Sequence, residues 1–245
     1  MIKYDKNLEI FSSSIINVDP VVSGFTTRAQ GNGQSIETIF NFFNNNRITY
    51  KKIIIPEQIH STNIVIFENK NNEKLEKIIE TDGVVTKEDN VILTVITGDC
   101  CPIIFSDRKN GVIGISHQGW RGSVKRMAQK MVDKMIEIGA DLKEIKVALG
   151  PSIGECCYDV DDDRYYEFRE EFDGYADKIF HTRAGRKHLN LTLLNYLLLT
   201  DCGIKKKNID HFPFCTRCDK KRFFSFRRDK KEEFGEMFSF VAKSV

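Results

Sequence analysis

No stretch of this sequence approaches the roughly 18 consecutive apolar residues that a membrane-spanning helix needs. The N-terminal segment MIKYDKNLEIF interrupts its apolar residues with Asp5, Lys6 and Glu9, so it lacks the apolar centre of a signal peptide. Internal repeats, low-complexity tracts and linkers are also missing. These absences predict a cytoplasmic protein that has no membrane segment.

An excess of charge of one sign is absent as well. The chain has 37 basic and 35 acidic residues, which excludes bulk electrostatic attraction to a polyanion. Basic residues do alternate with Phe223, Phe224 and Phe226, a pattern found in proteins that bind single-stranded nucleic acid. Because four acidic residues between 229 and 236 dilute this patch, we expect a strand with a buried Phe face and no nucleic-acid partner.

Several motifs that would identify a cofactor or a metal are missing. The sequence has no GxxxxGK[ST], no HExxH and no complete GxGxxG, since Gly31-Asn32-Gly33 lacks the third glycine. Cys215-x-x-Cys218 is one half of a zinc knuckle without a second CxxC, which argues against a structural zinc ribbon.

Cysteine, in contrast, is well represented in the chain. There are seven cysteines, an odd count, and they include the adjacent pairs Cys100-Cys101 and Cys156-Cys157. In a chain without a secretion signal, this pattern argues against a disulfide framework. It leaves reduced thiols, metal ligands or a nucleophile open.

Short β-branched and aromatic runs dominate residues 21 to 117, and several are apolar at consecutive positions, which is typical of strands covered on both faces. These runs are VVSGFTT, KKIIIPEQI, NIVIF, GVVT, VILTVIT, PIIFS and GVIGIS. We expect exposed loops at Asn44–Asn46 and Asn69–Glu76, and a further strand in IKVALG at 145–150.

Apolar residues recur at three- and four-residue steps from Ser123 to Ile138, which predicts an amphipathic helix that Gly139 caps. Further helices are expected at Asp161–Phe172 and Leu191–Leu199, and further strands at 209–214, 223–226 and 237–241. The fold class predicted is α+β, a single domain over residues 1–245 with a mixed β-sheet core flanked by helices.

Polar side chains stand where three of the predicted strands end. His60 follows KKIIIPE, Asp99 and Cys100 follow VILTVI, and His117 follows GVIGI. Two imidazoles and a thiolate form a three-ligand zinc site that leaves one coordination position open for catalysis. The alternative at this point is structural, because a lone His often makes a packing hydrogen bond and a buried Cys acts as a small apolar residue.

At these residues the chain resembles the YfiH-type family, long labelled multicopper polyphenol oxidase or laccase-domain proteins and now regarded as purine nucleoside phosphorylases. The matching segments include QIHS at 58–61, TGDCCPIIFSD at 97–107, GISHQGWRGSV at 114–124, ALGPSIGECCYDV at 148–160 and FCTRCDKKRFFSFRRD at 214–229. They follow the family order across nearly the whole chain.

The resemblance implies that His60, Cys100 and His117 bind zinc, with copper the less favoured metal. Cys101 falls on a variable position of the family pattern. No role follows for Cys156, Cys157 and Cys215, and we interpret Cys101, Cys202 and Cys218 as ordinary reduced thiols. The family's Thr-Gly-Arg near the C-terminus is replaced here by Glu233-Phe234-Gly235-Glu236, which removes a basic residue.

The activity that the resemblance implies is phosphorolysis of adenosine, inosine or methylthioadenosine to a free base and ribose 1-phosphate, with adenosine deaminase as a side activity. The partners would be purine nucleosides and phosphate. Arg121 at a helix start is the first phosphate candidate, followed by Arg28 and Arg227, because guanidinium binds phosphate in a bidentate fork. Asp99 is expected to orient a ligand or carry a proton, and Gln58 to support substrate binding.

Other functions stay open on the sequence alone. Cys100 and His117 also suit a metal-free cysteine hydrolase, as nucleophile and base. A laccase-type polyphenol oxidase needs clustered coppers with many histidines, and His181, His188 and His211 lie outside the matching ligand segments. A redox or interaction module built on the Cys pairs is a further alternative. The oligomeric state, monomer or homodimer, is undetermined.

Overall fold

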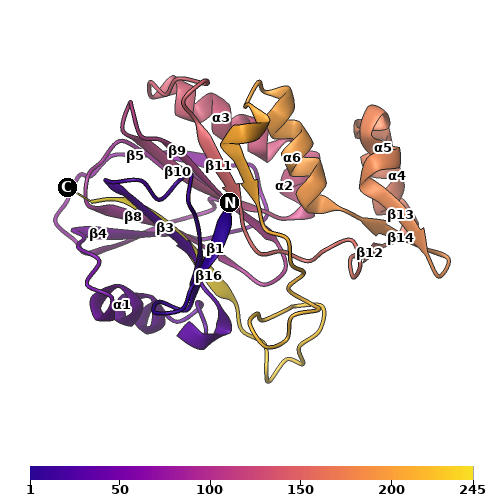
Figure 1. Cartoon of the computed structure of the whole chain (residues 1–245), viewed down its shortest axis with the longest axis horizontal. Helices are drawn as coiled ribbons and strands as arrows, with labels where there is room; N and C mark the ends of the chain where they lie inside the picture. The colour runs from indigo at the N-terminus through magenta and orange to yellow at the C-terminus, as the bar shows by residue number, and fades with distance from the viewer. Residues whose placement is uncertain (245) are drawn as a thin grey trace.

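Two large β-sheets lie face to face in the computed structural model, which describes residues 1–244 (Figure 1). The seven-stranded sheet contains, in spatial order, β1 (Ile2–Asp5), β2 (Ile10–Ser13), β3 (Val21–Phe25), β16 (Met237–Lys243), β8 (Val91–Thr97), β4 (Lys52–Pro56) and β6 (Leu75–Ile78). The six-stranded sheet contains β15 (Ile209–His211), β11 (Lys146–Leu149), β9 (Cys101–Asp107), β10 (Val112–Gln118), β7 (Gly83–Thr86) and β5 (Ile64–Phe67). Both sheets mix parallel and antiparallel pairs.

The central strands bury both of their faces. In β8, Leu93 points into the core between the two sheets, whereas Ile92 packs on the outer side. In β9, Ile104 points into the same central core and Phe105 points outward. Since successive side chains alternate across a sheet, apolar runs of this kind arise only where both faces are covered. This confirms the interpretation of the consecutive apolar positions.

Helices cover the outer faces, so the main body has four layers (Figure 1). Helix α1 (Ile36–Asn45) packs Ile39 and Phe43 on the larger sheet. On the smaller sheet lie α3 (Met127–Glu137), through Met131, and α6 (Leu191–Asp201), through Leu199. The predicted α+β class, with mixed sheets flanked by helices, is confirmed.

A smaller unit of structure extends beside these layers, at the right of Figure 1. It contains a three-stranded sheet of β12 (Asp159–Val160), β14 (Arg186–Leu189) and β13 (Phe180–Arg183), with α4 (Asp162–Glu171) and α5 (Asp173–Ile179). Asp161 caps α4 by accepting a hydrogen bond from the backbone N–H of Arg164, as its position before the helix predicts. The unit packs on α6 through an apolar cluster of its own.

The helix predicted at Ser123–Ile138 is two helices. Helix α2 (Trp120–Val124) starts earlier, and the chain turns at Arg126, where φ is 60°, before α3 begins. The break lets α3 lie along β10 and β7 while α2 contacts α6 and α4. A straight helix would not follow both surfaces. Gly139, at φ 94°, does end the second helix as predicted.

Two loop predictions and one strand prediction need correction. Asn44 and Asn45 end α1, because Phe42 and Phe43 bury its face, and β6 begins at Leu75 within a predicted loop. Residues 223–226 form turns and no strand. The backbone N–H groups of that segment have other partners: Phe223 donates to the Asp219 carbonyl, Phe224 to Sδ of Met237 and Ser225 to the Asp229 carboxylate.

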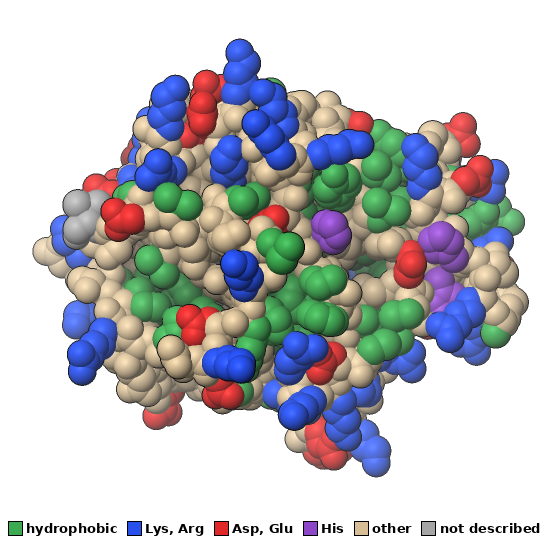
Figure 2. Space-filling view, viewed as in Figure 1, with side chains coloured by type: hydrophobic (Ala, Val, Ile, Leu, Met, Phe, Trp, Pro, Cys, Tyr) green, Lys and Arg blue, Asp and Glu red, His purple; other side chains and the backbone are tan. Residues whose placement is uncertain are grey.

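None of the helices within residues 1–244 is long and apolar enough to cross a membrane. On the face shown in Figure 2, acidic side chains lie among the basic ones, and apolar side chains are exposed between them. This distribution agrees with the balanced charge of the chain.

Candidate active site

A cavity of about 670 Å³ opens where the ends of several strands meet. His60 stands in the loop after β4, Cys100 in the connection from β8 to β9, and His117 near the end of β10. The cavity lining combines polar and charged side chains with aromatic and aliphatic ones. It includes Pro56, Gln58, His60, Ile96, Gly98, Asp99, Cys100, His117, Trp120, Arg121, Ile153, Tyr158, Arg164, Leu191, Phe226, Arg227, Phe234 and Glu236.

The three predicted metal ligands converge in this cavity. The ligand atoms of His60, Cys100 and His117 all lie within 4.8 Å of one another. The Cys100 Sγ atom is 3.9 Å from Nε2 of His60, and the two imidazole rings stand nearly perpendicular with centroids 4.7 Å apart. Two imidazole nitrogens and a sulfur, coming from three separate loops and strands, form a donor set that suits zinc or copper.

Asp82 organises this group, and the sequence analysis did not single it out. It is fully buried just before β7, and its Oδ1 lies 2.8 Å from Nδ1 of His117. The same carboxylate accepts backbone hydrogen bonds from Ile59, His60 and Ser61. Because Nδ1 of His117 is hydrogen-bonded to Asp82, the Nε2 atom remains available to bind a metal ion in the cavity. The sequence signal that could have identified Asp82 is an acidic residue directly before a buried strand.

Gly119 leaves the room that the donor group needs. A Cβ atom at this position would lie 2.8 Å from Cδ2 of His60 and 3.3 Å from Sγ of Cys100. The first distance is shorter than non-bonded carbons tolerate. The glycine in HQGWRG therefore keeps the chain close to the ligands without filling their space. Together with the donor set, this cradle fits a metal ion.

The electrostatics of the group favour a thiolate beside an imidazolium when no metal is bound. Burial raises the pKa of Cys100, but the charge of His117 and hydrogen bonds from His117 and His60 outweigh it and lower the pKa to about 7. Burial lowers the pKa of His117, whereas Cys100 and Asp82 raise it to about 10. Cys100 is thus ready to act as a metal ligand near neutral pH.

Of the two roles expected for Asp99, orienting a ligand histidine is not reflected in its hydrogen bonds. Its carboxylate accepts hydrogen bonds from the Thr216 and Ser225 hydroxyls and from the backbone N–H of Arg227. No contact with a ligand histidine appears among the hydrogen bonds of the described residues; Asp82 makes that contact to His117. Burial raises the pKa of Asp99, against the hydrogen bonds that lower it. Asp99 therefore anchors the C-terminal segment behind Cys100.

The three arginines that line the cavity differ in the partners that their guanidinium groups already have. Arg121 lines the cavity, is exposed, and stacks on Trp120, but it has no acidic partner within residues 1–244. Arg227 lines the cavity and pairs with Asp159 at 3.0 Å. Arg164, which the sequence analysis missed, also lines it and has a buried Nε atom without a hydrogen-bond partner in the described structure.

Arg28 and Gln58 each make contacts with other parts of the protein. The Arg28 guanidinium donates to the carbonyl of Lys220 and stacks on Phe224, and Arg28 is not among the residues that line the cavity. The Gln58 side chain lines the cavity, yet it both donates to and accepts from the backbone of Ile96. Gln58 thus connects the His60 loop to β8.

The remaining histidines lie apart from the cavity. His181 pairs with Glu155, His188 bonds to the Glu155 carbonyl, and His211 contacts Tyr196. Over residues 1–244, His60, Cys100 and His117 form the one candidate metal group that contains histidine. The clustered histidine sets that several coppers need are not formed there.

Comparisons with known proteins agree with this architecture. Residues 24–244 match the model of a family described as multi-copper polyphenol oxidoreductase laccase. Adenosine deaminase RL5, from an unknown prokaryotic organism, is 32% identical over 72% of this chain and 70% of its own length. Purine nucleoside phosphorylase YlmD of Bacillus subtilis (strain 168) is 36% identical over 66% of this chain and 58% of its own length.

A solved structure shows the same fold. The crystal structure of the Bacillus licheniformis hypothetical protein YfiH superposes with a TM-score of 0.80 at 29% identity, over 91% of this chain and 92% of that chain. The family match covers nearly the whole sequence, and the resemblance drawn from the sequence motifs is confirmed. The chain therefore belongs to the multi-copper polyphenol oxidoreductase laccase family.

Proposed function

We propose that this chain is a zinc-dependent purine nucleoside phosphorylase with adenosine deaminase as a side activity. The observation that carries the proposal is a three-donor metal group in the same cavity as Arg121, an arginine without an acidic partner in the described structure. Two relatives are named for these two activities. The reduced thiols of the chain suit a cytoplasmic location.

His60, Cys100 and His117 would hold the zinc ion, with Asp82 setting the tautomer of His117. Bound there, zinc supplies Lewis-acid chemistry at a fourth coordination position that no protein ligand fills. Zinc is preferred over copper because three donors with an open position match a catalytic zinc site, whereas oxidation by several coppers needs further histidine sets that residues 1–244 do not form.

Phosphorolysis forms a bond between a phosphate oxygen and the anomeric carbon of the ribose, and breaks the bond from that carbon to the purine nitrogen. The bonding electrons leave with the base, which then takes up a proton. Arg121 would hold the phosphate, because its guanidinium lines the cavity and has no acidic partner within residues 1–244. Arg164, which lines the same cavity and pairs with Asp161 at 3.6 Å, would assist. Arg227 would assist after releasing Asp159.

Aromatic side chains in the lining of the same cavity suit a nucleoside. Tyr158, Phe226 and Phe234 offer aromatic surface for a purine ring. Glu236 stands where the family has a basic residue, and its carboxylate would accept hydrogen bonds from ribose hydroxyls and repel phosphate. Phosphate would then bind at the arginines. The cavity volume of about 670 Å³ lies in the usual range for small-molecule sites.

Product analysis tests the reaction. Purified zinc-loaded protein is incubated with adenosine, with and without phosphate, and the products are separated by chromatography. We expect adenine and ribose 1-phosphate in the presence of phosphate and a smaller amount of inosine without it. If neither adenine nor inosine forms, the proposed function is wrong.

Substitution of the ligand cysteine tests the metal. Cys100→Ser should remove the ion from the cavity and abolish both activities. Cys101→Ser is the matched control, because the neighbouring Cys101 is buried on the helix-covered side of β9 and directs its thiol to backbone carbonyls. Unchanged metal content in Cys100→Ser would contradict the assignment.

Arg121→Gln tests the phosphate site. Loss of one charged donor to phosphate should raise the KM for phosphate roughly 10-fold to 100-fold and leave the KM for adenosine nearly unchanged. Arg108→Gln serves as the control, since Arg108 bonds to the Asp19 carbonyl and does not line the cavity. Equal effects on both KM values would assign Arg121 to general packing.

A second candidate is a metal-free cysteine hydrolase. The array Asp82–His117–Cys100, with the pKa of Cys100 lowered to about 7, has the order of an acid, a base and a nucleophile. Activity that survives metal removal but is lost on thiol alkylation would favour this function. Activity that chelation abolishes and zinc restores would favour the phosphorylase.

A further inference from the structure

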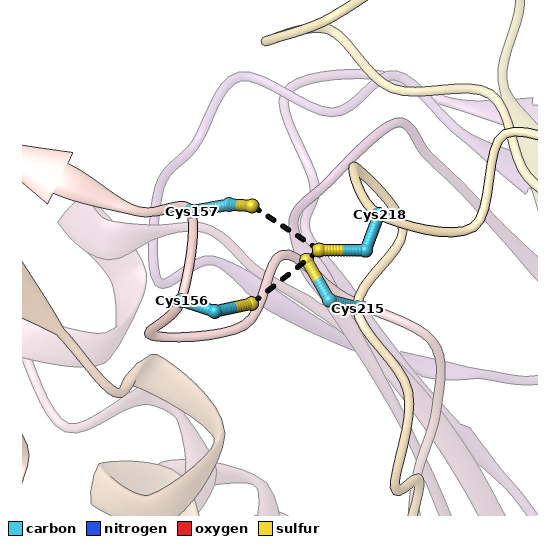
Figure 3. Close-up of side chains that lie close together, drawn as sticks. All are labelled: Cys156, Cys157, Cys215 and Cys218. Carbon is cyan, nitrogen blue, oxygen red and sulfur yellow. Dashed lines mark hydrogen bonds between the residues drawn. The ribbon is translucent and has the colours of Figure 1, made fainter.

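Four cysteines far apart in the sequence meet at one point outside the cavity. Cys156 and Cys157 lie in the loop before β12, and Cys215 and Cys218 lie in the segment after β15. Their sulfur atoms all lie within 4.8 Å of one another, and Figure 3 shows the four side chains pointing to a common centre. Cys215-x-x-Cys218 therefore has the partner pair that the sequence analysis did not find.

The sulfur separations do not correspond to disulfide bonds. Cys218 Sγ lies 3.6 Å from the sulfur of Cys156 and 3.3 Å from that of Cys157, whereas a disulfide needs about 2.05 Å. All four cysteines are free thiols. Four sulfurs at about 2.3 Å from one zinc ion would lie about 3.8 Å apart. The observed separations are close to this tetrahedral edge.

The backbone around the cluster is shaped to hold sulfur. The N–H of Gly154 donates a hydrogen bond to Cys215 Sγ at 3.1 Å. A Cβ atom at Gly154 would lie 3.1 Å from Cβ of Cys215 and 3.4 Å from Sγ of Cys156, so the glycine permits the close approach. An N–H donor to sulfur stabilises the thiolate, which is the form that binds metal.

We propose that Cys156, Cys157, Cys215 and Cys218 bind a structural zinc ion. Four thiolates complete a tetrahedral coordination and leave no open position, as in structural sites and unlike the cavity group with its three donors. The all-sulfur set selects a soft ion. This site shares no ligand with the cavity, so it does not depend on the reaction proposed above.

The ion would clamp two segments that form the cavity wall. One segment carries Ile153 and Tyr158, and the other carries Arg227. Between them the protein provides the short bridge of Ser152 with Cys215 and the hydrogen bond from the Thr216 N–H to the Ser152 carbonyl. A metal ion beside this bridge would add metal–sulfur bonds to the hydrogen bonds and the Arg227–Asp159 ion pair that already join the two segments.

Metal stoichiometry tests the proposal. Full-length protein and single variants are purified with zinc in the medium and analysed for metals by mass spectrometry. Cys218→Ser should contain one zinc ion fewer per chain than the wild type, and Cys202→Ser, whose thiol lies outside both groups, should keep the wild-type content. Cys100→Ser reports the cavity ion separately. Equal zinc in Cys218→Ser and the wild type would overturn the proposal.

The wild type gives a second test that does not require a variant to fold. Labelling of native protein with a thiol reagent, followed by peptide mass spectrometry, should show the four cysteines protected until a chelator is added. Rapid labelling of Cys156 and Cys218 before chelation would overturn the proposal, as would a disulfide among the four or iron in place of zinc. Cobalt substitution should give intense thiolate-to-metal absorption, of which Cys218→Ser loses the four-sulfur part and keeps the part due to Cys100 in the cavity.

Discussion

At the scale of single residues, the candidate active site depends on side chains that hold other side chains. Asp82 contacts His117 and the backbone of the His60 loop, and Asp99 binds three donors of the C-terminal segment. Both carboxylates are buried and make several hydrogen bonds, so each fixes the position of a neighbour that faces the cavity. The two carboxylates therefore hold other residues of the site in position.

Asp82→Asn should weaken metal binding about 10-fold to 100-fold, because the charge behind the ligand His117 is lost while the shape is kept. Competition with a chromophoric chelator measures the affinity. Asp107→Asn is the matched control: Asp107 is also fully buried and accepts backbone hydrogen bonds, but at the far end of β9. Equal metal affinity in the two variants would refute a positioning role for Asp82.

At the scale of elements, the ends of strands and helices place the chemistry. Helix α2 begins inside the HQGWRG segment, at Trp120, and the turn at Arg126 separates it from α3, so that Trp120 and Arg121 reach the cavity. The small unit of β12 to β14 contributes Tyr158 and Arg164 from its edges. The wall of the cavity is thus assembled from elements that are far apart in the sequence.

The turn between β13 and β14 offers a test of local backbone chemistry. Ala184 and Gly185 both have positive φ, 47° and 74°, in a two-residue hairpin connection. Asn adopts this conformation more readily than Ala, so Ala184→Asn should stabilise the protein by about 0.5–1 kcal/mol. Ala184→Val should destabilise it, because a β-branched residue resists positive φ. Urea unfolding measures both, and the same sign for both would contradict the assignment.

At the scale of the whole molecule, stability rests on the core between the two sheets. Leu93 and Val95 of β8 meet Ile104 of β9 and Ile113 of β10 across this interface. The strands that end around the cavity are those whose inner faces form the core. Packing of the two sheets therefore sets the distances among the ligand loops.

Leu93→Ala should destabilise metal-loaded protein by about 2–5 kcal/mol, because it leaves a cavity in the core. The free energy of unfolding from urea titration measures the loss. Ile79→Ala is the control: Ile79 is 73% exposed, and its truncation should change stability by less than about 0.5 kcal/mol. If both variants lost a similarly small part of the free energy of unfolding, the central role of the inter-sheet core would be contradicted.

Local sequence pattern was sufficient for many elements and for bringing forward the three candidate ligands that the cavity places together. The apolar runs indicated the central strands, Asp161 indicated the start of α4, and the motifs around His60, Cys100 and His117 indicated the ligands. Pattern was not sufficient for residues 223–226, where the Asp219 carbonyl, Sδ of Met237 and the Asp229 carboxylate accept the backbone N–H groups that a strand would have used.

By itself, the sequence determined which residues could act as ligands, because donor chemistry belongs to the side chain. Only the tertiary structure decided which of them act together. Asp82 reaches His117 across neighbouring strands, and the Cys156-Cys157 pair meets Cys215 and Cys218 some 60 residues later. The physical reason is that pairings at this separation depend on the stacking of the two sheets and on loop closure, which no local period in the sequence encodes.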